Sequence, residues 1–306
     1  MRVYFAPLQG YTESFQRLAH RQVIGGCAEY YRPFIRLERG EFRRRDLAEL
    51  SDGDLDSVPQ ALARSYDEAF RISELVSSHG FRRLDLNFGC PFPKVVSGGY
   101  GSGILGNADA VRDVLRVVEA FPDLSYSVKL RLGQSSVDES KSLIPLLNDT
   151  RLCQVVMNPR LGRQGFGGEA DWAAYEAFAG QIRHDMIANG DMLTKDDASR
   201  FSAVMIGRGL LGNPLLGVEL SEGVAIEGGK RIELLRMYHR AMVANLGGIE
   251  QPLQKLKTVW DYFLPDAKGR LRKAVIKSRT LDEYLGCVEA LFDSLGSEWA
   301  SGDLRY

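Results

Sequence analysis

The segment LDLNFGCPFPK at residues 84–94 decides how the chain is read, together with the glycine-rich segment GGYGSG at residues 98–103. An alternating apolar segment, typical of a strand, ends abruptly at Asn87, Gly89 and Cys90. The Cys90 thiol is therefore expected at the C-terminal end of a strand, on a turn stiffened by proline and opened by glycine. In parallel α/β proteins such loops usually carry the chemistry. A buried structural cysteine is the alternative, but the surrounding prolines and glycines favour a functional loop.

Composition places the chain among ordinary globular enzymes. It has 306 residues, of which 44% are hydrophobic and 26% charged, and no apolar run approaches the roughly 20 residues of a membrane helix. The first residues lead straight into a strand pattern, so no signal peptide is expected. Four cysteines are scattered without a C-x-x-C pair, which argues against a disulfide framework or zinc site. We expect a monomer in a reducing cytoplasm, without metal or membrane association.

Short apolar or alternating segments predict eight strands, most of them separated by helical patterns. This alternation is typical of an α/β protein with the (β/α)8 TIM-barrel fold. The expected strands, some with their following turn, cover residues 3–6, 30–36, 58–62, 82–89, 126–133, 153–157, 185–191 and 203–214. Helices are expected at residues 13–22, 66–79, 107–120 and 137–149, and the charged residues 38–56 are interpreted as a surface excursion.

The pattern changes to helices alone from Lys230 onward. We therefore predict a barrel domain at residues 1–228 and a small all-α helical bundle domain at residues 229–306, with helices near 270–279 and 280–295. The formal net charge of the chain is −1, yet residues 229–306 hold 13 Lys and Arg against 10 Asp and Glu. A basic stripe can bind phosphates, although a solvated helix face would have the same composition. The stripe consists of Lys255, Lys257, Lys268, Arg270, Arg272, Lys273, Lys277 and Arg279.

Two further features point to a bound anion or electron-rich group. The strand at residues 126–133 alternates strictly and directs Lys129 and Arg131 into the lumen of a closed barrel, where an unpaired cation is costly. The segments at 189–191 and 207–208 follow the last two strands. In TIM barrels these loops commonly form a phosphate site from backbone amides and a basic side chain.

The motif Asn87-x-Gly-Cys-Pro-x-x-Lys-Val, followed by the glycine-rich segment, resembles the active-site signature of bacterial tRNA-dihydrouridine synthases. These FMN enzymes reduce uridine in tRNA. The opening Ala6-Pro7-Leu8-Gln9-Gly10, the strand at 126–133 and both phosphate segments also resemble the family in the same order. The resemblance thus covers nearly the whole chain. It implies that FMN is bound by Pro7, Leu8, Gln9, Gln60, Lys129, Asn158, Asn189, Gly190, Asp191, Gly207 and Arg208.

The family's chemistry assigns roles to the remaining residues. FMN would deliver hydride to C6 of uridine, Cys90 would protonate C5, and NADPH would reduce the flavin. An unperturbed thiol, with a pKa of about 8.5, suits such an acid. The resemblance implies a substrate site formed by Asn87, Lys94, Arg131 and Arg160. Asn87 would hold the uracil edge, and the C-terminal helices would grip the tRNA backbone.

One position departs from the family pattern. The family usually has a histidine where this chain has Asn158, and asparagine cannot carry charge or shuttle a proton near neutral pH. Two alternatives therefore stay open beside tRNA uridine reduction. One is a flavin dehydrogenase of the dihydroorotate or dihydropyrimidine type that acts on a free pyrimidine. The other is a catalytically weakened paralogue that binds flavin or RNA.

Overall fold

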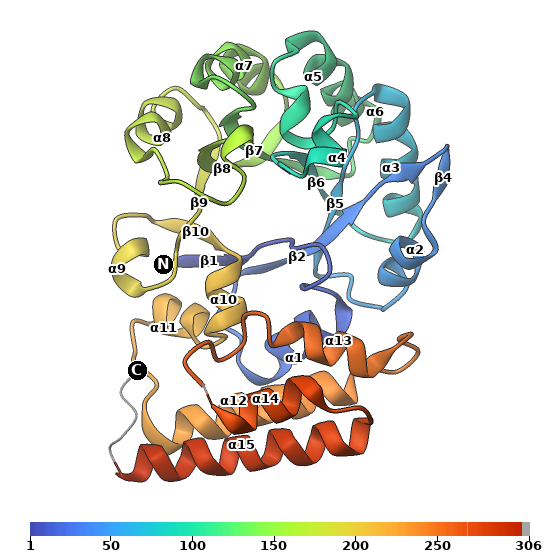
Figure 1. Cartoon of the computed structure of the whole chain (residues 1–306). Helices are drawn as coiled ribbons and strands as arrows, with labels where there is room; N and C mark the ends of the chain where they lie inside the picture. The colour runs from blue at the N-terminus through green and yellow to red at the C-terminus, as the bar shows by residue number, and fades with distance from the viewer. Residues whose placement is uncertain (268, 302–306) are drawn as a thin grey trace.

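Eight parallel strands close into a barrel in the order β1-β10-β9-β8-β7-β6-β5-β2, which confirms the predicted TIM-barrel fold (Figure 1). The computed structural model describes residues 1–267 and 269–301, with side chains described as far as residue 297. The barrel strands are β1 (Arg2–Phe5), β2 (Glu29–Ile35), β5 (Val58–Ala61), β6 (Arg83–Phe88), β7 (Ser125–Gly133), β8 (Leu152–Leu161), β9 (Asp185–Asn189) and β10 (Ala203–Ile206).

Helices follow most strands and cover the outside of the barrel. The barrel-domain helices are α1 (Ser14–Val23), α2 (Arg44–Leu50), α3 (Tyr66–Ser78), α4 (Pro93–Val96), α5 (Ala108–Leu115), α6 (Val117–Ala120), α7 (Val137–Asp149), α8 (Trp172–Ala179), α9 (Lys195–Ala198), α10 (Arg208–Gly212) and α11 (Leu216–Glu222). Short 3-10 turns, η1 (Gly101–Ile104) and η2 (Gly162–Gln164), lie in the loops after β6 and β8.

The structure refines three predicted elements. The charged excursion contains a small hairpin, β3 (Leu37–Glu38) with β4 (Glu41–Phe42), followed by α2. The single helix expected at 107–120 is two helices, α5 and α6, which meet at Arg116. The strand expected at 153–157 continues as β8 to Leu161 and carries Asn158 beside Arg131 of β7. Pairing with β7 extends β8, a long-range interaction that local sequence does not reveal.

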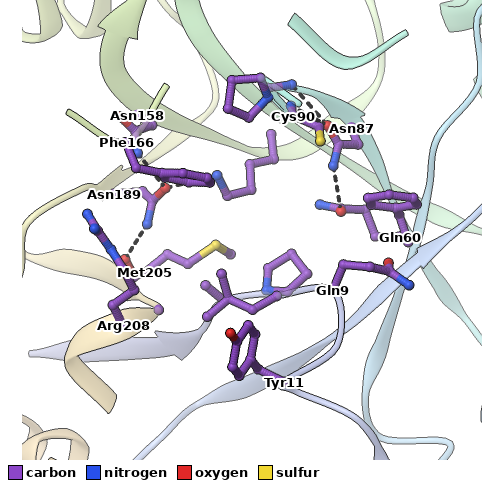
Figure 2. Close-up of a pocket in the computed structure, with 18 of the residues that line it drawn as sticks. Gln9, Tyr11, Gln60, Asn87, Cys90, Asn158, Phe166, Asn189, Met205 and Arg208 are labelled. Atoms are coloured by element: carbon purple, nitrogen blue, oxygen red, sulfur yellow. Dashed lines mark hydrogen bonds between the residues drawn. The ribbon is translucent and has the colours of Figure 1, made fainter. Parts of the chain in front are cut away.

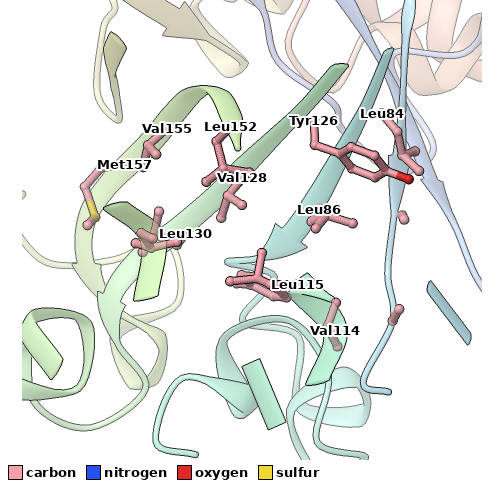
Figure 3. Close-up of a cluster of buried hydrophobic side chains, with 14 of the residues drawn as sticks. Leu84, Leu86, Val114, Leu115, Tyr126, Val128, Leu130, Leu152, Val155 and Met157 are labelled. Atoms are coloured by element: carbon pink, nitrogen blue, oxygen red, sulfur yellow. The ribbon is translucent and has the colours of Figure 1, made fainter. Parts of the chain in front are cut away.

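Strand alternation divides the barrel side chains between two cores. Outward-facing Leu86, Val128 and Val155 from β6, β7 and β8 belong to a cluster with Val114 and Leu115 of α5 (Figure 3). The lower lumen holds a second apolar layer, with Tyr4, Tyr31, Val58, Val156 and Ile187 among its members. Met205 of the same cluster also faces the cavity at the C-terminal ends of the strands. Because apolar side chains already fill this layer, the polar side chains of the lumen gather nearer the C-terminal ends of the strands.

Four helices form the C-terminal region and pack beneath the barrel in the view of Figure 1. They are α12 (Gly228–Ala244), α13 (Pro252–Val259), α14 (Arg270–Lys277) and α15 (Leu281–Ser301). The predicted boundary between residues 228 and 229 coincides with the start of α12. However, the buried cluster of this region also includes Phe15 and Ala19 of α1 and Leu215 beside α11. The helical region therefore shares its core with the barrel.

The predicted basic stripe divides into structural and exposed residues. Lys255 pairs with Glu13 at 2.6 Å, Lys257 donates to the Ser278 carbonyl, and Arg272 donates to carbonyls around the end of α13. By contrast, Arg270, Lys273 and Lys277 are exposed on α14. Arg279 is also exposed, and Lys268 lies outside the described residues. Among the helices described, none combines the length and apolar character that crossing a membrane requires.

Two histidines are buried. His20 lies where the helical region meets the barrel, and His239 lies inside the helical region. His20 lies between the Tyr30 hydroxyl, at 2.9 Å, and the Pro214 carbonyl, at 2.8 Å. His239 Nε2 lies 2.7 Å from the Tyr284 hydroxyl, whose oxygen also accepts a 2.8 Å bond from Trp260. The Tyr284 hydroxyl can donate to a neutral His239 while it accepts from Trp260. Burial lowers the pKa of both histidines to about 4.

This neutral state predicts acid-labile folding. An unfolded histidine takes up a proton below about pH 6.5, whereas both folded rings remain neutral to about pH 4. The free energy of unfolding should therefore fall as the pH drops through this interval, by on the order of 2 kcal/mol per ring. Urea unfolding across the interval measures it. His239→Gln, which keeps an acceptor for Tyr284, should remove roughly half of the pH dependence. An unchanged slope would contradict this account.

Candidate active site

A cavity of about 610 Å³ opens at the C-terminal ends of the strands. Its wall draws residues from β2, β5, β6, β7, β8, β9 and β10, and from the loops after β1 and several of these strands (Figure 2). The structure brings nearly all of the predicted site residues together here. Those that line the cavity are Pro7, Leu8, Gln9, Gln60, Asn87, Cys90, Lys94, Lys129, Arg131, Asn158, Asn189, Gly190, Asp191, Gly207 and Arg208.

The Cys90 loop is held from several sides. The Asn87 side-chain oxygen accepts the backbone N–H groups of Gly89 and Cys90, at 3.0 and 2.9 Å. The Cys90 carbonyl accepts from the backbone N–H and the hydroxyl of Ser102, at 3.0 and 3.1 Å. Arg131 Nε donates to the Gly89 carbonyl at 2.9 Å. These bonds fix the backbone that carries the thiol, so the direction of Cys90 does not depend on its own side-chain contacts.

Burial raises the pKa of the Cys90 thiol, although a backbone hydrogen bond from Phe92 and the charges of Arg131 and Lys129 act in the opposite direction. The thiol therefore keeps its proton at neutral pH. A protonated thiol can donate to a carbon or oxygen of a bound molecule, whereas a thiolate would act as a nucleophile. This state matches the acid role predicted for Cys90.

Lys129 reaches across the lumen to an amide pair on neighbouring strands. Its ammonium donates to Asn189 Oδ1 at 2.9 Å, and Asn158 Nδ2 lies 3.3 Å from the same oxygen. Asn189 Nδ2 donates in turn to the Met205 carbonyl at 2.7 Å, which fixes the direction of the Asn189 oxygen. Burial, and next the repulsion of Arg131, lowers the pKa of Lys129 to about 8. Burying a cation is unfavourable without an anionic partner, so Lys129 is well placed to bind an anionic or electron-rich ligand.

The residues predicted to bind a phosphate lie together at one edge of the cavity. Gly207 caps α10, and Arg208 begins that helix with its guanidinium 3.4 Å from Asp191. Asp191 takes up a left-handed backbone with φ +43°, immediately after Gly190 with φ +120°. These backbone angles turn the loop sharply between β9 and α9. The arrangement leaves loop amides and one partly exposed guanidinium at the cavity edge.

Arg160 corrects one prediction. It does not line the cavity but is 3% exposed behind it, where it donates twice to the Gly168 carbonyl, at 3.1 and 2.8 Å, and pairs with Asp191. Arg160 thus holds the loop after β8 against the loop after β9. Asn87 also differs from expectation. Its oxygen and one N–H already hold the Cys90 loop and Gln60, which leaves one N–H for a ligand.

Two buried acceptors in the wall have no hydrogen-bond partner among the described residues. They are Oε1 of Gln9 and Oδ1 of Asn158. An unpaired buried acceptor costs free energy unless a ligand or water donates to it. The isoalloxazine ring of a flavin offers an N–H donor, and its ribityl chain offers hydroxyl donors. The residues present therefore fit a flavin, and Asn158 can serve as an acceptor for it without a histidine's proton.

Several wall residues were missed by sequence reasoning. Phe166 lies between Arg131 and Arg208, whose guanidinium carbons are 5.6 and 5.5 Å from the ring centre. Arg43 and Arg45 reach the cavity from the excursion that was interpreted only as surface. Tyr262 reaches it from the helical region and packs edge-on against Tyr11 at 5.1 Å. The run of arginines at 43–45 was the one feature of the sequence that could have indicated that these side chains line the cavity.

Comparison with known proteins identifies the family. The family model described as "Dihydrouridine synthase (Dus)" matches residues 4–272. The chain belongs to the dihydrouridine synthase family. Membership confirms the family and the flavin-dependent oxidoreductase class predicted from the sequence. The chain is 26% identical to the tRNA-dihydrouridine(16) synthase of Ralstonia nicotianae, and the match covers 98% of both chains. It is also 26% identical to a probable tRNA-dihydrouridine synthase of Rhizobium leguminosarum, over 91% of both chains.

Solved structures agree with the barrel fold of the chain. Histamine dehydrogenase from Rhizobium superposes with a TM-score of 0.57 at 10% identity, covering 80% of this chain and 49% of that one. Morphinone reductase superposes with a TM-score of 0.51 at 12% identity, covering 73% and 87%. At such low identity these similarities support the barrel alone.

Gly101 gives a direct test of the Cys90 loop. A Cβ at Gly101, whose φ is +57°, would lie 2.5 Å from the Cys90 carbonyl oxygen. Gly99, in the same loop with φ +78°, has open space around it. Gly101→Ala should therefore lower the free energy of unfolding by about 2–4 kcal/mol, against about 1 kcal/mol for Gly99→Ala. Equal losses in urea unfolding would show that the close approach to Cys90 is unimportant.

Proposed function

We propose that this dihydrouridine synthase reduces the C5=C6 bond of uridine in tRNA to 5,6-dihydrouridine, with FMN as cofactor and NADPH as reductant. The observation that carries the proposal is a protonated, backbone-anchored thiol on the wall of a cavity whose orphaned acceptors fit a flavin. Family membership and the full-length similarity to a tRNA-dihydrouridine(16) synthase support the substrate.

Each residue has a defined part in the proposed reaction. FMN, when bound, supplies hydride chemistry to the pyrimidine. Lys129 places a positive charge beside the cofactor, and Gln9, Gln60 and Asn158 meet its polar edges. Adding hydrogen across C5=C6 also requires a proton on the carbon next to the one that receives hydride. Cys90 Sγ supplies that proton, because burial keeps the thiol protonated.

A uridine inside folded RNA must leave its stack to enter a barrel cavity. The rim therefore has to hold the surrounding phosphates while one base is extruded. Lys94, Arg36 and Arg45 lie around the mouth of the cavity, and the exposed basic residues of α14 lie on the helical region. These cations give a tRNA two separate places to bind, which a free-pyrimidine dehydrogenase would not need.

Replacing the proposed acid tests the mechanism. Cys90→Ala should lower the rate of dihydrouridine formation by roughly 10²–10⁴-fold while the variant still binds flavin and consumes NADPH. Purified protein is incubated with dihydrouridine-free tRNA and NADPH, and the product is mapped by mass spectrometry. Position 16 is measured first, because the full-length relative from Ralstonia is named for it.

The exposed Cys153, at the start of β8, provides a matched control. Cys153→Ala should keep the wild-type rate. Wild-type protein that makes no dihydrouridine in tRNA but reduces free pyrimidines would favour the dehydrogenase alternative. Flavin and tRNA binding without turnover, with activity appearing in Asn158→His, would favour the weakened paralogue.

Neutralising the face of α14 tests the proposed tRNA contact. The triple change of Arg270, Lys273 and Lys277 to Gln should weaken tRNA binding roughly 10–100-fold at low salt and reduce the salt slope by about 1 for each phosphate that the variant no longer neutralises. A control triple of Arg112 on α5, Arg116 between α5 and α6, and Lys141 on α7 changes the net charge equally, far from α14 (Figure 1). Equal weakening by both triples, measured by filter binding, would reject a specific contact.

A further inference from the structure

Asp85 is a buried carboxylate of β6 that the proposed reaction does not use. It is 0% exposed in the lumen, two residues before Asn87. Its oxygens accept from the Ser127 hydroxyl at 2.6 Å and from Gln60 Nε2 at 2.7 Å. Burying a carboxylate is unfavourable unless it is paired or has a use, and an apolar residue of similar size is often more stabilising.

Asp85 has no ion-pair partner among the described residues. Lys129, a buried cation on the neighbouring strand β7, donates instead to Asn189. The charges of Asp85 and Lys129 still stabilise each other at longer range, so charge compensation accounts for only part of the role of the carboxylate. What Asp85 does provide at neutral pH is an acceptor that cannot donate. Burial raises its pKa only to about 6, so the carboxylate is ionised there and carries no hydrogen.

That property orients two amides in series. Because Asp85 can only accept, Gln60 must present its NH₂ group to it and its oxygen to the other side. The Gln60 oxygen then accepts from Asn87 Nδ2 at 2.7 Å. Asn87 must in turn direct its own oxygen to the backbone N–H groups of Gly89 and Cys90, at 3.0 and 2.9 Å. The two backbone N–H groups can only donate, so they fix Asn87 at one end of the series, while Asp85 fixes Gln60 at the other end. Without the carboxylate the buried Gln60 NH₂ group loses its acceptor, and the series is held at the Asn87 end alone.

We propose that Asp85 is a positioning residue that fixes both Gln60 in the cofactor wall and the loop that carries Cys90. It acts through the hydrogen-bonded series Asp85, Gln60, Asn87 and Cys90, which joins two adjacent strands to the turn after β6. Its effect on catalysis rests on the proposed function. Its effect on the Cys90 loop does not, and can be measured without any substrate.

The test compares Asp85→Leu, which removes both acceptors, with Asp85→Asn. In Asp85→Asn the side-chain oxygen can still accept from Gln60, while its NH₂ group meets the Ser127 hydroxyl. The first readout is iodoacetamide labelling of Cys90 in the flavin-free and flavin-loaded proteins, resolved from the other cysteines by peptide mass spectrometry. The second is the separate effect on kcat and KM for tRNA.

The two changes should differ in both readouts. Asp85→Leu should speed Cys90 labelling about 3–10-fold and lower kcat at least about 10-fold, with KM for tRNA within about 2-fold, because the loop is released while the RNA-binding surface stays intact. Asp85→Asn, which keeps one acceptor for Gln60 but can also present its NH₂ group, should give labelling and kcat between those of wild type and Asp85→Leu. Cys90 labelling in Asp85→Leu that stays within about 2-fold of wild type, or is no faster than in Asp85→Asn, would overturn the proposal.

Neighbouring residues on β7 supply a matched control. Ser127→Ala removes the 2.6 Å bond to Asp85 on the lumen face, and Tyr126→Phe removes a 2.8 Å bond to Ser73 on the outer face. Only Ser127→Ala should change Cys90 labelling, and equal effects of the two would overturn the proposal. If Asp85→Leu does not fold, Gln60→Met breaks the same series one step later and should speed labelling. Wild type without dihydrouridine activity, but with these labelling differences, would reject the proposed function and keep the positioning role.

Discussion

Barrel closure directs alternate side chains of every strand into one shared lumen, and the rest of the structure depends on this constraint. Polar groups there cannot reach bulk water, so each must find a partner inside the lumen or in a ligand. The lower lumen meets the constraint with apolar side chains such as Val58 and Ile187. The upper lumen meets it with amides and cations, and two acceptors stay unpaired among the described residues. The site is therefore the part of the lumen where buried acceptors lack a hydrogen-bond partner among the described residues and can accept from a ligand.

The polar lumen also explains how a loop residue can be held firmly. Cys90 belongs to a turn, yet its backbone is tied to side chains of β6 and β7 and to the first turn of η1. Arg160 similarly ties the loop after β8 to Asp191 in the loop after β9. Strand side chains, which have little freedom, thus stabilise the loops that surround the cavity. A reactive side chain on such a loop, such as Cys90, is therefore held nearly as precisely as a side chain on a strand.

The helical region contributes more than an attached platform. Its core includes Phe15 and Ala19 of α1, so it cannot separate from the barrel without exposing apolar surface on both sides. Tyr11 joins the two parts near the cavity, since its hydroxyl donates to Asp261 at 3.0 Å and its ring meets Tyr262. A nucleic acid bound to the helices would therefore meet the cavity at a fixed distance and angle.

The sequence by itself determined the fold, the identity of the Cys90 turn and most residues of the site. Alternation along residues 126–133 predicted that Lys129 enters the lumen, because strand periodicity is local. Only the tertiary structure decided what each polar group binds. It turned Arg160 away from the cavity, engaged Asn87 with the Cys90 loop, and brought in Phe166 and Tyr262 from segments with no local signal. Hydrogen-bond partners on different strands are set by register and barrel closure, and neither is encoded in the spacing of neighbouring residues.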